Sequence, residues 1–253
     1  MKPASMLIQY FIKSLLLAAT MIAVAEPALA QTLSLDLGQG GPTATGRLVQ
    51  LFLLFTVLSL APAILVMMTS FTRIVVVLSF MRTAMGAQQT PPNQVMVSLA
   101  MFLTFFVMMP TFEASWEQGI RPYIDGDIEE KEAFEKSAKP VQKFMMKHVR
   151  DQDLELFMDM AKVGPVAIPD DVPIKALIPA FMISELRRAF EIGFLVFIPF
   201  LVIDMVVASV LMSMGMMMLP PIIIALPFKI IFFVLVDGWY LIVGSLVQSF
   251  GSG

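Results

Sequence analysis

Long apolar runs and one polar stretch alternate along this chain of 253 residues. The apolar runs, dominated by Leu, Ile, Val, Phe and Met, cover residues 48–71, 93–112, 192–212 and 222–235. An apolar run of about 20 residues is long enough to cross the hydrocarbon core of a bilayer as a helix. The pattern predicts an all-α membrane protein with four spans, in which two apolar helical hairpins, residues 48–112 and 186–253, flank a polar helical insert, residues 113–185.

The insert faces water, because it holds 15 of the chain's 20 acidic residues. Apolar residues recur in it at helical spacing in two series, at Phe134, Ala138, Val141, Met145 and Val149 and then at Leu154, Phe157, Met158 and Ala161. Asp151 is a plausible cap for the second series, and Gly164-Pro165 a plausible stop. We expect two short amphipathic helices, with His148 as an exposed polar residue.

The apolar character of the first run continues past residue 71, through the segment 73–82. A continuous helix over residues 48–80 would be about 50 Å long, well beyond a hydrocarbon core of about 30 Å. Part of this helix is therefore expected to pack in protein rather than in lipid.

The first 30 residues have the pattern of an export signal. Lys2 and Lys13 precede an apolar segment, residues 14–24, that is too short to span a bilayer. Small residues at Ala28 and Ala30 predict cleavage between Ala30 and Gln31, leaving residues 31–47, rich in Gly, Ser and Thr, as a flexible leader. The alternative is a first membrane anchor, because the apolar region can be extended back to Met6.

Each of the last two apolar runs carries one ionisable residue, Asp204 or Lys229. If the runs form a hairpin, both side chains lie at the same depth, roughly 18–20 Å from the bend at about 1.5 Å per residue. A charge in the middle of a bilayer costs about 2.5–3.5 kcal/mol, so such residues normally face a partner or a wet cavity. Two roles are open for the pair: fixing the register of the hairpin, or relaying protons.

The turn between these runs holds five of the chain's 22 methionines, Met212, Met214, Met216, Met217 and Met218. It has no Lys or Arg, which is unusual for a turn exposed to water. Methionine is unbranched and adaptable, so it suits a surface that must re-pack around different partners. The cluster favours a soft seal over core filling.

Charge also favours one orientation of the chain. With the mature N-terminus outside and four spans, the insert and the C-terminus lie outside as well. The short loop of residues 72–92, which has Arg73 and Arg82 and no acidic residue, is then cytoplasmic. Short cytoplasmic loops carry an excess of Lys and Arg, as this orientation requires.

Composition argues against several function classes. The chain has no Cys and one His, so thiol chemistry and Cys/His zinc sites are not available. A net charge of −3 without a basic stripe argues against nucleic-acid binding. The sole His lies in the polar insert, away from any Ser of the apolar runs, and Asp204 is matched with a lysine rather than a second carboxylate. We therefore expect no enzyme activity, metal or cofactor.

Two longer motifs carry a resemblance to a known family. Residues 69–94 read TSFTRIVVVLSFMRTAMGAQQTPPNQ, and residues 179–194 read PAFMISELRRAFEIGF. In this order they resemble the signatures of the FliP family, the P subunits of the flagellar type III export gate, and the resemblance covers about residues 48–250. The signal and leader favour the flagellar branch over relatives in injectisomes.

The resemblance implies a ring-like, helically staggered oligomer of this chain, completed by the small Q and R subunits and contacted by an FlhB-type subunit. Its conduit would pass unfolded flagellar proteins out of the cytoplasm, at the basal body in the bacterial inner membrane. The family's Met-rich constriction maps onto the five methionines of the turn, and its buried acid/base pair onto Asp204 and Lys229. The rival function, a self-contained proton-coupled transporter or ion channel, would suit one charged pair but is not supported by inverted repeats.

Other polar residues are candidates for contacts between helices or between subunits: Arg73, Arg82, Gln88, Gln89, Glu185, Arg187, Arg188 and Glu191. The last four are spaced so that they can pair along one helix face, and pairing between subunits remains open. For Gln88 and Gln89 the alternative is a simple helix break at Pro91.

Overall fold

The computed structural model describes residues 42–87, 90–164, 172–216 and 219–251. Within these residues the chain forms helices and short connections and no strand, which confirms the all-α prediction. Several predicted features lie outside them: the signal peptide, the Ala30/Gln31 cleavage site, Gln88, Gln89, Met217 and Met218. The chain divides into two compact units, Met1–Val57 and Leu58–Gly253, and the second contains every site described below.

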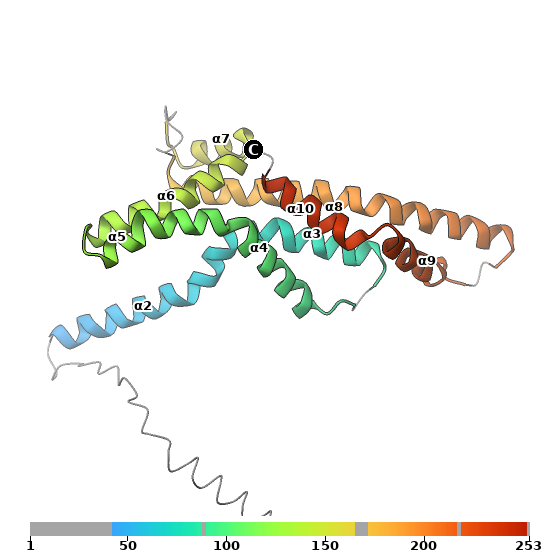
Figure 1. Ribbon diagram of the computed structural model, residues 1–253, viewed down its shortest axis with the longest axis horizontal. Helices are drawn as coiled ribbons and strands as arrows, with labels where there is room; N and C mark the ends of the chain where they lie inside the picture. The colour runs from blue at the N-terminus through green and yellow to red at the C-terminus, as the bar shows by residue number, and fades with distance from the viewer. Residues whose placement is uncertain (1–41, 88–89, 165–171, 217–218, 252–253) are drawn as a thin grey trace, which may run out of the picture. The chain divides into compact units, whose positions relative to one another are not determined.

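Ten helical elements follow one another along the described residues (Figure 1). They are α2 (Pro42–Met67), α3 (Phe71–Ala84), α4 (Asn93–Ser115), the π-helix η1 (Trp116–Ile120), α5 (Arg121–Ile124), α6 (Glu130–His148), α7 (Asp151–Met160), α8 (Ile174–Ser213), α9 (Pro221–Leu235) and α10 (Gly238–Gly251). Helix α2 begins at Pro42, inside the range predicted as leader. Proline suits the first turn of a helix, where its missing N–H would have no partner in any case.

The single helix considered for residues 48–80 does not form, because the chain breaks between Met67 and Phe71. Hydroxyl groups take over backbone bonding there: Thr72 Oγ1 donates to the Val66 carbonyl at 3.3 Å, and the Phe71 N–H donates to Thr69 Oγ1 at 3.4 Å. Ser and Thr side chains commonly offer the backbone such alternatives to helix continuation. The break lets α3 take its own direction.

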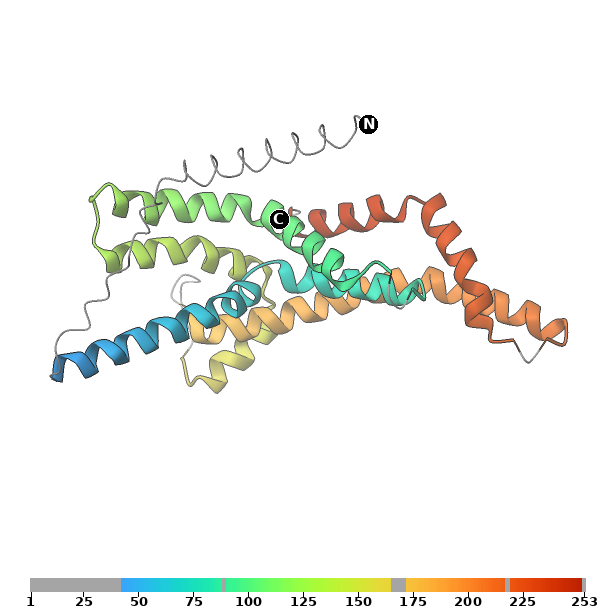
Figure 2. The ribbon, with the colours of Figure 1, turned by 90° about the horizontal axis from the view of Figure 1, so that it is seen from below.

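Helix α3 lies in the centre of the second unit, alongside α8 (Figure 2). Its residues Ile74, Val77, Leu78 and Met81, spaced three and four apart, have no exposed surface. This spacing places them on a common side of the helix, against α8 and α4. The expectation that part of this run packs in protein is therefore correct.

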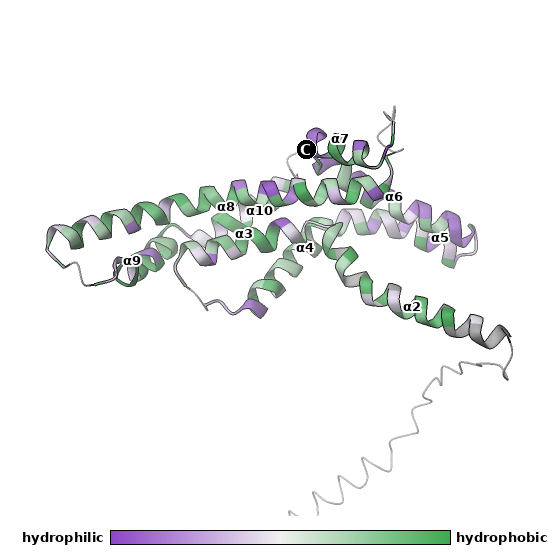
Figure 3. Cartoon of the chain, turned by 180° about the vertical axis from the view of Figure 1, so that it is seen from behind, coloured by the Kyte–Doolittle hydropathy of each residue, from purple (hydrophilic) through white to green (hydrophobic). Residues whose placement is uncertain are grey.

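The insert folds into the two amphipathic helices that the sequence predicts, α6 and α7 (Figure 3). Asp151 is the first residue of α7, and Arg150 occupies the cap position instead. Phe134 does not lie on a buried face, because it is 75% exposed. The expectation for His148 was also wrong: it is half-buried, with its ring 4.7 Å from that of Phe144.

Helices α6 and η1 approach each other closely at a glycine. A Cβ atom added at Gly119 would lie 2.0 Å from the Ser137 hydroxyl and 2.6 Å from the Ala133 carbonyl, so only glycine fits here. This contact fixes α6 against the end of α4 and so positions the side chains of α6 beside those of α4.

Helix α8 is longer than the sequence analysis expected. It starts at Ile174, so residues 174–185, assigned to the polar insert, belong to the same 40-residue helix as the predicted hairpin arm. Four apolar residues of this stretch are buried: Ala176, Leu177, Ala180 and Phe181. The predicted boundary at residue 185 therefore falls inside a helix, and the stretch 174–185 has only two charged residues, Lys175 and Glu185.

Among the described residues, two helical segments are long and apolar enough to cross a membrane, Asn93–Ile124 and Ile174–Ser213. Helices α9 and α10, bent by 63° at their junction, make a third if they act together. The first predicted span is represented by a shorter apolar helix, Leu51–Leu60. The count of four spans, and the orientation built on it, remain predictions.

Candidate functional site

The methionine turn, residues 211–221, begins at a hydrogen-bonded end of helix α8. Helix α8 ends in a Schellman motif: the Met216 N–H donates to the Leu211 carbonyl and the Gly215 N–H to the Met212 carbonyl, each at 3.0 Å. Gly215 takes φ +75°, the left-handed conformation that this motif places just after a helix. Pro221 then starts α9 at a position where its fixed φ suits a first turn.

Three methionines of this turn, Met212, Met214 and Met216, lie among the described residues, and all three are exposed. Met212, Met214 and Met216 are 57%, 65% and 40% exposed, whereas the neighbouring Leu211 is buried. Burying such side chains is favourable by roughly 1.5–3 kcal/mol each, so their exposure in one chain indicates a surface completed by something else. The end of α8 is thus a hydrogen-bonded bend that carries exposed, apolar side chains.

Below the turn, Asp204 of α8 and Lys229 of α9 are in contact, with Lys229 Nζ 2.6 Å from Asp204 Oδ2. The same Nζ donates to the Ala84 carbonyl at 3.1 Å. Ala84 is the last residue of α3, where helix carbonyls lack intrahelical partners and carry partial negative charge. Lys229 therefore joins three helices through one ammonium group.

The two members of this pair differ in burial. The Lys229 side chain is 4% exposed and that of Asp204 32%. Asp204 Oδ1 is itself enclosed and has no hydrogen-bond partner in the described part of the chain. The site thus holds a lysine that depends on the protein for its counter-charge and an aspartate that retains some access to solvent.

A second, fully buried pair joins Arg73 of α3 to Glu185 of α8. Arg73 Nε donates to Glu185 Oε2 at 2.8 Å, a second guanidinium nitrogen donates to Oε1, and neither residue has exposed surface. The third nitrogen reaches α10, donating to Ser249 Oγ at 3.0 Å and to its carbonyl at 3.3 Å. The guanidinium also lies 3.8 Å from the centre of the Phe250 ring.

The other predicted polar residues are placed on the surface or at a helix end. Arg187 and Glu191 pair with each other on α8, Nε to Oε1 at 3.0 Å, and Arg188 is exposed. Arg82, in the last turn of α3, donates to Asn93 Oδ1 and, at 3.3 Å, to the Pro91 carbonyl. Glu185 is thus separated from its sequence neighbours and contacts a helix 112 residues away.

Sequence reasoning missed three partners in these sites: the Ala84 carbonyl, Ser249 and Phe250. A backbone carbonyl leaves no signature in side-chain identity, and Ser249 and Phe250 belong to an apolar helix without any charge that would suggest a polar contact. Among the described residues, no group of three His, Asp or Glu side chains is arranged to hold a metal ion.

Comparison with known proteins gives a direct result. The model of the FliP family matches residues 54–246, which is most of the chain. The chain belongs to the FliP family.

Relatives in the FliP family cover most of the chain and of their own length. The flagellar biosynthetic protein FliP of Caulobacter vibrioides is 60% identical over 227 residues, which are 89% of this chain and 85% of the relative. The protein of the same name from Bacillus subtilis is 58% identical over 209 residues, 83% of this chain and 95% of the relative. The one from Agrobacterium fabrum is 49% identical, with 94% and 99% covered.

The two FliP-like motifs are in contact in the folded chain. Residues 69–82 of the first motif form α3 with the break before it, and residues 179–194 of the second lie on α8. Arg73 and Glu185, one from each motif, are the buried pair between them. At Gly193 of the second motif, a Cβ atom would lie 2.6 Å from the Phe80 ring of the first. The FliP signatures are therefore the two sides of one helix interface.

Proposed function

We propose that this protein is a core subunit of the flagellar type III protein export gate, which forms the conduit through which unfolded flagellar subunits leave the cytoplasm. Membership in the FliP family and relatives named as flagellar biosynthetic proteins support the biological process. The single structural observation that carries the role is the methionine turn, with its exposed thioether side chains on a fixed backbone bend. The protein is a structural component of this machine rather than an enzyme.

Exposed apolar surface supports assembly with other subunits. Along α8, Leu195, Met205 and Val206 are 65%, 60% and 57% exposed, and on α9 Ile223 and Val234 are 63% and 70% exposed. Both helices of the hairpin thus present large apolar side chains that remain exposed in the single chain. Other copies of this chain, the small Q and R subunits and an FlhB-type subunit are the proposed partners, with lipid covering what remains.

The methionine turn is the proposed seal of the conduit. A passage for unfolded chains must close on an empty bore and deform around side chains of any size. Methionine has rotatable bonds, bulk and little directional chemistry, so several copies converging from an oligomer can interdigitate and then part. The closed Schellman motif supports this role, because it holds the backbone while the side chains move.

The Asp204–Lys229 pair is proposed to fix the register of the hairpin rather than to relay protons. Lys229 is bonded to both Asp204 and the end of α3, which is an arrangement that orders three helices. Family membership, which the transporter or channel alternative does not explain, also favours the gate. A mass measurement of the purified complex separates the two, since a gate subunit should be found in a larger oligomer with foreign small subunits.

The chain is a membrane protein, and we place it in the bacterial inner membrane at the flagellar basal body, with the insert and C-terminus toward the periplasm. The proposed signal peptide should be removed before Gln31. N-terminal sequencing of membrane-extracted protein is expected to return Gln31, and a sequence beginning at Met1 would contradict this part of the proposal.

The test of the seal is a leak measurement on assembled gates. Changing the turn methionines 212, 214, 216, 217 and 218 to Ser should leave assembly intact but let ions or small molecules pass. Leu at the same positions should keep the seal and slow export, since branched side chains re-pack less readily. The matched control is Ser at Met101 and Met109, which are exposed to a similar degree on α4. Serine variants of the turn that stay as tight as wild type would place the seal elsewhere.

A further inference from the structure

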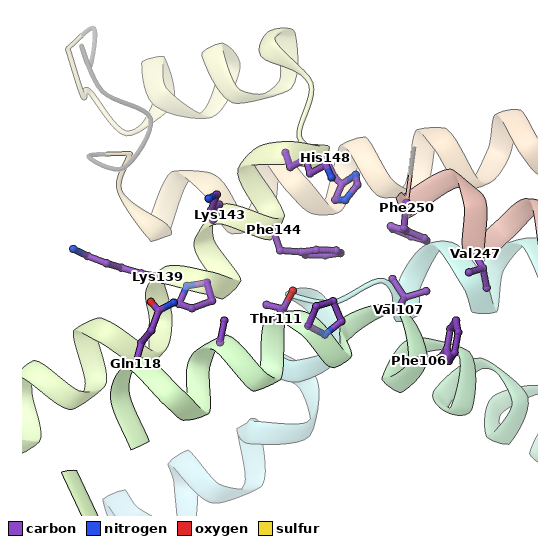
Figure 4. Close-up of a pocket in the computed structure, with 15 residues that line it drawn as sticks. Phe106, Val107, Thr111, Gln118, Lys139, Lys143, Phe144, His148, Val247 and Phe250 are labelled. Carbon is purple, nitrogen blue, oxygen red and sulfur yellow. The ribbon is translucent and has the colours of Figure 1, made fainter. Parts of the chain in front are cut away.

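A cavity of about 660 Å³ lies between α4, α6 and the end of α10, and neither ion pair nor any described methionine of the turn lines it (Figure 4). Its floor is apolar and aromatic, with Phe106, Val107, Phe144, Val247 and Phe250 among the lining residues. Lys139, Lys143 and Lys147 of α6 also line it, and no Asp or Glu is among the described residues of the lining. The cavity therefore combines a cationic side with an apolar one.

Part of the polar lining and part of the apolar lining lie at opposite ends of the cavity. Figure 4 shows Lys139 and Gln118 at one end and Phe106, Val247 and Phe250 at the other. Phe106 lies on the apolar part of α4, a candidate membrane span, and Gln118 lies in η1, where α4 continues into the polar insert. The cationic end thus lies toward the water-facing insert and the aromatic end toward the hydrophobic part of the span.

Two of the lysines at this cavity, Lys139 and Lys143, have no acidic partner among the described residues. Lys136, three residues before the first α6 residue of the lining, pairs with Glu132 at 2.9 Å. Lys139 and Lys143 are exposed, and neither forms an ion pair with any residue in the described ranges. Like charges at i and i+4 on a helix repel each other, so a bound anion would relieve that repulsion. His148 at the far end contributes no charge near neutral pH, because burial lowers its pKa to about 4.

We propose that this cavity binds one anionic glycerophospholipid, with its phosphate at Lys139 and Lys143 and an acyl chain along Phe144 toward Phe106. The order of charge and apolar surface along the cavity matches the order of headgroup and chain in a lipid whose tail points into the bilayer. Basic pockets beside membrane helices bind anionic headgroups by this combination. The site uses none of the residues proposed for the gate's seal or register, so its failure would leave the proposed function in place.

The test uses the full chain in detergent with a tryptophan reporter in the cavity. Trp116 and Trp239, the chain's two tryptophans, are replaced by Phe, and Phe106 is replaced by Trp. Phosphatidylglycerol with brominated chains should quench this reporter at a concentration at least about five-fold lower than phosphatidylcholine with the same chains. The double variant K139Q/K143Q should reduce that preference to about one.

A matched control removes two lysines elsewhere on the same chain. Lys131 and Lys175 are exposed and do not line the cavity, so K131Q/K175Q should keep the preference for phosphatidylglycerol. Equal loss in both double variants would overturn the proposal, because general charge attraction would then explain the binding. Equal quenching by both lipids, or by neither, would also overturn it. So would displacement of phosphatidylglycerol by inorganic phosphate at low millimolar concentration, which would assign the lysines to a free anion.

Discussion

Lys229 and Asp204 contact each other at 2.6 Å but differ in burial, with 4% of the lysine side chain exposed and 32% of the aspartate. Removal of either residue leaves the other without its counter-charge. The consequences should differ, because a carboxylate with solvent access can be hydrated and an enclosed ammonium cannot.

We expect Asp204→Ala to be more damaging than Lys229→Ala. The first strands an enclosed ammonium with only the Ala84 carbonyl, which should cost roughly 3–5 kcal/mol, and the second should cost less. The double change Asp204→Asn with Lys229→Gln should recover part of the loss. Thermal unfolding in detergent, run as a double-mutant cycle, gives the coupling energy, and additive effects would contradict the contact.

The Arg73–Glu185 pair should be important for stability, while the Arg187–Glu191 pair should not. Arg73→Met or Glu185→Gln leaves an unmatched group in a site with no exposed surface, so we expect a loss of about 3–5 kcal/mol. Arg187→Gln breaks an exposed pair that begins two residues further along α8 and should change stability by no more than about 1 kcal/mol. Comparable unfolding midpoints for Glu185→Gln and Arg187→Gln would show that the buried pair is dispensable.

Gly215→Ala should destabilise the hairpin bend by about 1–2 kcal/mol, because a residue with a Cβ pays that cost in the left-handed conformation. No neighbouring atom would clash with the new methyl group, so the effect isolates backbone strain. Gly244→Ala is the matched control: it lies inside α10, also in open space, and should stabilise by about 0.5–1 kcal/mol. Effects of the same sign in the two variants would argue against the proposed strain.

Stability should fall as pH is lowered from about 6.5 to 4, in part through His148. Burial lowers the pKa of His148 to about 4, and the positive charges of Arg73, Lys147 and Arg188 act in the same direction. Between these pH values the unfolded chain binds a proton that the folded chain does not, so stability rises with pH across this range. Since His148 is only half-buried, we expect a contribution of about 1–2 kcal/mol after solvent screening.

The variant His148→Gln isolates this contribution, because the carboxylates titrate equally in both proteins. The difference in unfolding midpoint between wild type and variant should change steadily from pH 7 to pH 4. A constant difference over that range would mean that His148 titrates normally in the fold.

Local patterns predicted much of the fold. Helical spacing located α6 and α7, and the gap between the apolar runs 192–212 and 222–235 located the hairpin bend, because these patterns depend on residues a few positions apart. The break between Met67 and Phe71 was not predicted. It rests on Thr69 and Thr72 hydroxyls that bond to backbone atoms, and the same residues also occur within unbroken helices.

Contacts between residues far apart in the sequence could be predicted only where both residues lie at equal distances from a predicted turn. Asp204 and Lys229 could be matched because they lie at equal distances from one turn. Arg73 and Glu185 could not, since 112 residues separate them and no turn relates α3 to α8. The packing of His148 against Phe250 could not be predicted for the same reason, because it depends on where α10 packs against α6.

The bond from Arg73 to Ser249 also bears on the order in which the protein matures. A ribosome completes α3 and most of α8 well before it reaches residue 249, so Glu185 can engage the guanidinium early while its third nitrogen has no protein partner. The Phe250 ring that lies against the guanidinium arrives one residue later still. The environment of the buried guanidinium is therefore complete only after α10 has packed against α3, so docking of α10 completes this site.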